Sequence, residues 1–138
     1  MPMKLAEFAP HYSWLVGQRF VEQDRSVSFD GQWHTIVHLV GPAFALKVEF
    51  DPLGALAWIG SEAGGWNQLC WVLSIVAPGA MPNFPEGGLD REAEARALKD
   101  NLAAVTDLYR HGDLSALRDE VRRRARADSV RIGLTPPD

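Results

Sequence analysis

The stretch SVSFDGQWHTIVHLVGPAFALKVEFDPLGALAWIG, residues 26–60, decides the fold. Three turn signals interrupt it: Asp30-Gly31, Gly41-Pro42 and the tetrapeptide at residues 51–54. Asp and Gly tolerate the positive φ of a tight hairpin, and Pro cannot donate to a strand ladder. The runs between these signals are rich in β-branched and aromatic residues, which favour strands. They predict four short antiparallel strands in up-and-down order, at residues 25–29, 33–40, 44–50 and 55–59.

Alternation within two of these strands predicts which face of the sheet is buried. Residues 44–50 alternate between apolar and polar side chains, and the apolar set is Phe44, Leu46, Val48 and Phe50. In residues 33–40 the more apolar set is Trp33, Thr35, Val37 and Leu39. Because side chains alternate across a strand, both sets should face the core and leave the opposite face of the sheet in water.

Helices are predicted on both sides of this meander. Residues 4–16 have apolar side chains at helical spacing, and Pro10 either kinks this helix or begins it. The spacing in residues 66–77 favours a helix, with a strand as the alternative because the run is short and β-branched. Residues 90–111 and 113–127 predict two more helices, which Asp90 and Asp113 would cap and Gly112 would separate.

Together these elements predict an α+β domain. It consists of a four-stranded antiparallel β-meander with an N-terminal helix and C-terminal helices packed on one face. At 138 residues the chain fits one domain and can bury a core without help from metals or disulfides. We expect residues 1–128 to form this domain and residues 129–138, which include Pro136-Pro137, to form a flexible tail.

Composition points to a cytoplasmic protein. No apolar run reaches the roughly 18 residues of a membrane span, and the N-terminus lacks a signal-peptide pattern. The net charge of −4 opposes nucleic-acid binding and is compatible with a basic protein partner. The single cysteine, Cys70, lies in an apolar run and is interpreted as a buried hydrophobic residue.

The polar face of the predicted sheet contains the candidate site residues His34, His38, Lys47, Glu49 and Asp51. On a strand, the Cβ atoms of the two histidines would be about 13 Å apart, at about 3.3 Å per residue, which is too far to share a metal ion. Glu49 and Asp51 could do general acid–base chemistry, although solvated charges are the simpler interpretation. The sequence has no catalytic triad, dinucleotide fingerprint or P-loop, so we expect no metal, no cofactor and no catalytic residues.

Two further features could make contacts with a partner. Trp58 and Trp66 are the tryptophans most expected to be partly exposed, and tryptophan is enriched at interface hot spots. The helix at residues 113–127 contains several arginines, of which Arg118, Arg122 and Arg126 share a face. That face is either a solvated helix surface, a contact for an anion or a nucleic acid, or a contact for an acidic protein.

The order of these motifs resembles a widespread group of small bacterial proteins. The shared features are the meander with its DG turn, the strand pair ALKVEFDPLGALAWIG, a tryptophan after a glycine-rich loop, and two C-terminal helices ending in an arginine-rich run. The group is similar to the immunity proteins of bacterial toxin systems. Residues 78–88, a long Pro/Gly loop, depart from its pattern.

The resemblance implies a non-enzymatic protein that neutralises a cognate toxin by direct binding. The predicted contact residues are His34, His38, Lys47, Glu49, Asp51, Trp58 and Trp66. The alternative is a small enzyme or ligand-binding domain with a polar pocket on the sheet face. Neither interpretation fixes the oligomeric state.

Overall fold

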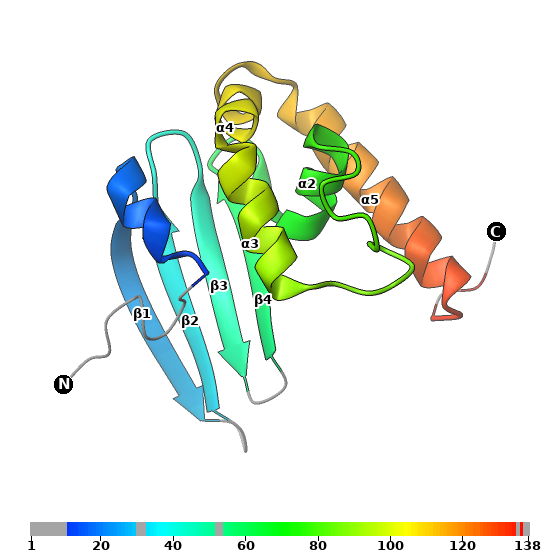
Figure 1. Ribbon diagram of the computed structural model, residues 1–138, viewed down its shortest axis with the longest axis horizontal. Helices are drawn as coiled ribbons and strands as arrows, with labels where there is room; N and C mark the ends of the chain where they lie inside the picture. The colour runs from blue at the N-terminus through cyan, green and yellow to red at the C-terminus, as the bar shows by residue number, and fades with distance from the viewer. Residues whose placement is uncertain (1–10, 30–32, 52–53, 135, 137–138) are drawn as a thin grey trace.

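The computed structural model describes residues 11–29, 33–51, 54–134 and 136. Within these ranges, residues 24–29, 33–34, 50–51 and 54–55 are described by their backbone alone. The architecture is α+β, with an antiparallel sheet and helices packed against it (Figure 1). The predicted turn at residues 30–31, the central residues 52–53 of the turn predicted at 51–54, and the predicted helical residues 4–10 lie outside the described part of the chain.

The sheet is a meander with strand order β1-β2-β3-β4-β5, in which every neighbouring pair is antiparallel. Its strands are β1 (Val21–Phe29), β2 (Trp33–Val40), β3 (Ala45–Asp51), β4 (Gly54–Ser61) and β5 (Gly65–Gln68). In the pairing of β1 with β2, Glu22 lies opposite Leu39 and Asp24 opposite His38, so Gln23 is an extra residue in a β-bulge. The four predicted strands are present.

The prediction of only four strands was wrong, because β5 occupies the start of the predicted helix at residues 66–77. The chain turns back after β4, where the amide of Gly64 donates to Ser61 Oγ over 3.0 Å. Residues 65–68 then pair along β4, and the helix begins at Leu69. A four-residue strand is too short for its alternation to stand out beside the helical spacing that follows it.

The predicted inner face of the sheet is confirmed wherever side chains are described. The buried members are Thr35, Val37, Leu39, Phe44, Leu46 and Val48, and Ala57 and Ile59 on β4 join them. The side chains of Trp33 and Phe50 lie outside the description.

The helices are η1, a 3₁₀ helix (Ser13–Gln18), α2 (Leu69–Val76), α3 (Arg91–Asp100), α4 (Leu102–His111) and α5 (Leu114–Arg131). The caps predicted at Asp90 and Asp113 are confirmed, since both carboxylates accept hydrogen bonds from backbone amides of the following turn. Helix α5 runs past residue 127 and includes the first residues of the segment predicted as a tail.

The single helix predicted at residues 90–111 is interrupted at Asn101, which has φ −120° and ψ 20°. The Asn101 side-chain amide donates to the carbonyl oxygen of Ala97 over 2.9 Å. Short polar side chains compete in this way for backbone groups and bend helices. The periodicity of the apolar residues continues across the bend, which is why it predicted one helix.

Helix α2 lies at the centre of the domain. It contacts β4, β5, α3, α4 and α5, and Leu69, Cys70, Trp71, Val72 and Leu73 are buried. The prediction that Cys70 is buried is confirmed, and burial raises the pKa of its thiol to about 12. The thiol is therefore neutral and unreactive at neutral pH.

A buried carboxyl group, Glu94 on α3, faces this core and is 1% exposed. The hydroxyl of Tyr12 donates to Glu94 Oε1 over 3.1 Å. Burial raises the pKa of Glu94 to about 7, against the opposing effects of the Tyr12 hydrogen bond, the charge of Arg91 and the backbone amide of Cys70. Glu94 therefore links the segment before η1 to the helical layer.

The raised pKa of Glu94 predicts that stability falls between about pH 4.5 and pH 7. In that interval the unfolded state releases the proton that the folded state keeps, so the stabilisation is complete below about pH 4.5 and lost above about pH 7. A shift of this size corresponds to roughly 3 kcal/mol in the free energy of unfolding. Urea denaturation at a series of pH values should show this slope in the wild type and a much flatter profile in Glu94→Gln.

Glu92→Gln is the matched control, because Glu92 is an exposed glutamate on the same helix, paired with Arg96. It should keep the wild-type slope. Equal slopes of stability against pH in wild type and Glu94→Gln would show that the pKa of Glu94 is not raised.

Candidate functional site on the outer face of the sheet

The face of the sheet opposite the core is the surface on which the predicted site residues converge. Figure 1 shows η1, α3 and α4 on the near side of the sheet, where the core lies. Side chains that alternate with the core residues point to the far side, which we call the outer face. Among the described residues its members include His38, Lys47, Glu49, Trp58 and Trp66.

One row of this outer face is apolar from edge to edge. The backbone register places one residue of each strand in line, namely Val21, Val40, Ala45, Gly60 and Trp66. Val21 is 65% exposed, Val40 37% and Trp66 40%. We call this set the apolar row. Single exposed apolar residues are ordinary, but three that lie in one row of a sheet face, joined by Ala45 and Gly60, gather apolar surface in the way an interaction surface does.

Trp66 lies flat on the sheet because Gly60 leaves room for it. A Cβ atom at Gly60 would stand 2.7 Å from the Trp66 ring atoms Cδ2 and Cε3. The indole reaches from β5 across β4, so that Lys47 Nζ lies 4.2 Å from its ring centroid and the His38 ring centroid lies 5.7 Å away. The ammonium over the ring face is a cation–π contact. Three predicted site residues therefore form one cluster.

The remaining predicted residues lie beside this cluster or have only a described backbone. Trp58 pairs with Lys47 and Gln68 in the register and is partly exposed, as predicted; its buried Nε1 donates to no described residue. Glu49 is half-buried on the same face. His34 and Asp51 belong to β2 and β3, and their side chains lie outside the description.

Sequence reasoning missed Val21 and Val40 as site residues. Val40 belonged to the alternate set predicted to face water, and its exposure followed from that alternation. Val21 could not be assigned to a face of the sheet, because the bulge at Gln23 changes the alternation within β1. The signal for the apolar row was therefore only partly present in the sequence.

Metal ligands and a pocket are the features that the alternative, a small enzyme or ligand-binding domain, would use. His34 and His38 lie on one strand, as the argument against a shared metal ion assumed. Among the described residues, no group of three or more His, Cys, Asp or Glu side chains could hold a metal ion. A pocket of about 440 Å³ does exist, but helix α2, the loop after it and helix α5 line it, and no outer-face residue takes part.

Comparisons with known proteins identify no relative of this chain: no family model, no curated protein and no solved structure matches it. None of the described helices is long and apolar enough to cross a membrane.

The contact between Trp66 and Gly60 predicts the effect of a single methyl group. Gly60→Ala would place Cβ against the Trp66 ring and 2.7 Å from the carbonyl oxygen of Gly65, a backbone atom that cannot move freely. Overpacking of this kind should lower the free energy of unfolding by about 1–3 kcal/mol, measured by chemical denaturation.

Gly17→Ala is the matched control, because nothing lies within 4 Å of a Cβ atom at that position. It should leave the stability unchanged or raise it by up to about 1 kcal/mol, because alanine restricts the unfolded chain. If Gly60→Ala is as stable as Gly17→Ala, the Trp66 ring does not rest on Gly60.

Proposed function

We propose that this protein is a non-enzymatic binding module that holds another protein on its outer sheet face. The apolar row is the observation that supports the proposal. It places the exposed side chains of Val21, Val40 and Trp66 in one line across the sheet, with Ala45 half-buried between them and Gly60 buried under the Trp66 ring. A partner that covers this line would remove apolar surface from water, and each Å² so buried would stabilise the complex by about 25 cal/mol.

The surroundings of the row resemble the anatomy of a protein interface. Trp66 is a large rigid side chain at one end, and tryptophan is among the residues that dominate binding energies. His38, Lys47 and Glu49 supply polar groups beside it, in the way that a polar rim surrounds an apolar centre. Such a surface suits a folded protein better than a small substrate, because it is a broad face and not a pocket.

The more specific proposal is that the partner is a bacterial toxin and that this protein is its immunity protein. The resemblance in motif order supports it, and so does the chain's net charge of −4, which would speed association with a basic toxin. In this proposal the protein acts in the cytoplasm and inhibits by covering the surface that the toxin needs.

A protection assay tests this proposal. The candidate toxin is any toxic domain found encoded next to this gene, expressed from an inducible promoter together with this protein. Wild type should restore growth. Val21→Ser and Trp66→Ser should weaken toxin binding by about tenfold or more, as truncation of an interface anchor does, and reduce growth accordingly.

Ile132→Ser is the matched control, since Ile132 is an exposed apolar residue, 51% exposed, at the end of α5 and away from the sheet. It should protect as well as wild type. Loss of protection in all three variants, or in none, would show that the outer face is not the contact. Absence of any protection by the wild type would refute the immunity proposal.

A further inference from the structure

A pocket that no outer-face residue lines has the features of a small-molecule site. It lies between helix α2, the loop at residues 77–88 and helix α5, and its volume is about 440 Å³. Sites for small organic ligands occupy roughly 300–1,000 Å³ and combine apolar walls with a few fixed polar groups. This pocket lies apart from the outer face, so it is independent of the function proposed above.

One wall of the pocket is aromatic and apolar. Trp71 and Phe84 contact each other edge to face, with ring centroids 4.7 Å apart, and Met81 lies beside them. The loop that supplies Phe84 and Met81 is held by its own turns: Ala80 N donates to Ala77 O and Phe84 N to Met81 O, both over 3.0 Å. The loop at residues 78–88, which departs from the pattern of the resembling group, thus forms part of a wall of this pocket.

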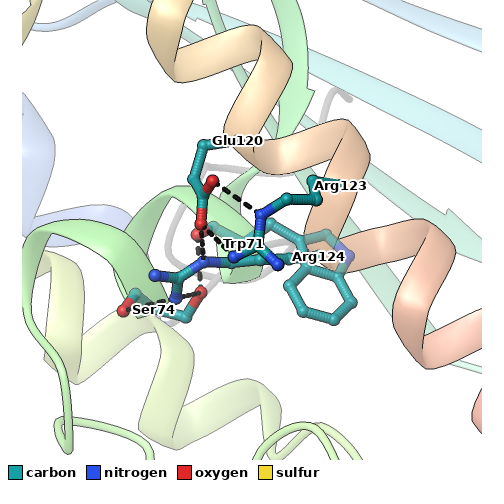
Figure 2. Close-up of polar contacts among 5 residues, drawn as sticks. All are labelled: Trp71, Ser74, Glu120, Arg123 and Arg124. Carbon is teal, nitrogen blue, oxygen red and sulfur yellow. Dashed lines mark hydrogen bonds and ion pairs between the residues drawn. The ribbon is translucent and has the colours of Figure 1, made fainter.

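The facing wall of the pocket, on α5, carries two arginines whose guanidinium groups are held by hydrogen bonds. Figure 2 shows Arg124 between Glu120 and Ser74: its Nε donates to Glu120 Oε1 over 2.8 Å, and its Nη1 to the Ser74 carbonyl oxygen over 3.3 Å. Arg123 donates to both oxygens of the same carboxylate, over 2.9 and 2.6 Å. The hydrogen bonds from Arg123 and then from Arg124 are the main causes that lower the pKa of Glu120 to about 2, so Glu120 stays ionised and holds both guanidinium groups.

Both arginines keep donors for a ligand. Nη2 of Arg124 and Nη1 of Arg123 donate to no described residue. Their side chains are 36% and 67% exposed, so an incoming molecule can reach them. The pocket lining also includes Arg131, which is paired with Asp128, and Glu86. With Glu120 on Arg123 and Arg124, the charges around the cavity balance, so the unused donors of these two arginines, and not a net positive charge, would recognise an anion.

We propose that this pocket binds a small organic anion with a flat apolar body. The ring would lie against Trp71 and Phe84, and the carboxylate or phosphate would accept hydrogen bonds from Arg124 and Arg123. Planar guanidinium groups match the oxygen spacing of both anions, and prior fixation by Glu120 and Ser74 reduces the entropy lost on binding.

The test is a titration of the full chain with 2-naphthoate and with 2-naphthyl phosphate. Calorimetry measures the Kd, and amide NMR shows which residues are affected. We expect saturable binding of at least one of them with a Kd of about 0.1–1 mM, the range expected for a ligand of this size. The shifted amides should belong to α2, residues 77–88 and α5. The tighter of the two probes identifies the preferred anionic group.

Three variants locate the site. Arg124→Met and Arg123→Met should each weaken binding by about tenfold, since each removes a charge-assisted hydrogen bond. Arg122→Met, on the same helix but outside the pocket, should leave the Kd within about twofold. Arg123 is mostly exposed, so its variant remains informative if Arg124→Met fails to fold.

Four results would overturn the proposal. They are no saturable binding of either probe, equal Kd values in wild type and both pocket variants, equally tight binding of the neutral analogue 2-naphthalenemethanol, and amide shifts confined to the sheet.

Discussion

The burial of helix α2 is the constraint on which the rest of the structure depends. Its sequence, LCWVLSIV, is apolar on nearly every side, and such a helix is stable in water only when other elements surround it. The strands β4 and β5 cover it on one side, and α3, α4 and α5 cover the others. The N-cap at Asp90 and the bend at Asn101 matter because they let the chain wrap around so short a helix.

One segment of twelve residues, 65–76, connects the two candidate binding surfaces, the outer face and the pocket. Residues 65–76 begin with β5, from which Trp66 points outward over Gly60 while Asn67 is buried. They continue into α2, where Trp71 reaches the aromatic wall of the pocket and the Ser74 carbonyl holds Arg124. Any change that shifts β5 relative to α2 would therefore alter the two surfaces together.

The sequence predicted the features that repeat locally and missed those that depend on distant contacts. Strict alternation placed Leu46 and Val48 inside and Lys47 outside, and the Asp90 and Asp113 caps followed from residue type. The fifth strand was missed because pairing with β4, not local pattern, makes it a strand. The face shared by Arg118, Arg122 and Arg126 is predicted to be solvated or to contact a partner, yet Arg118 donates to the carbonyl oxygen of Gly64. The bond from Arg124 to the carbonyl oxygen of Ser74 has no local signal either. Such partners, about fifty residues away, leave no mark on local spacing.

The bulge at Gln23 has a consequence for how the protein can associate with itself. Strand β1 forms one edge of the sheet, and a long regular edge invites another copy to add its own strand. An extra residue breaks the even spacing of amides and carbonyls along that edge and increases its twist. The domain can thus display a row of apolar side chains on its surface while its backbone resists the edge-to-edge stacking that leads to aggregates.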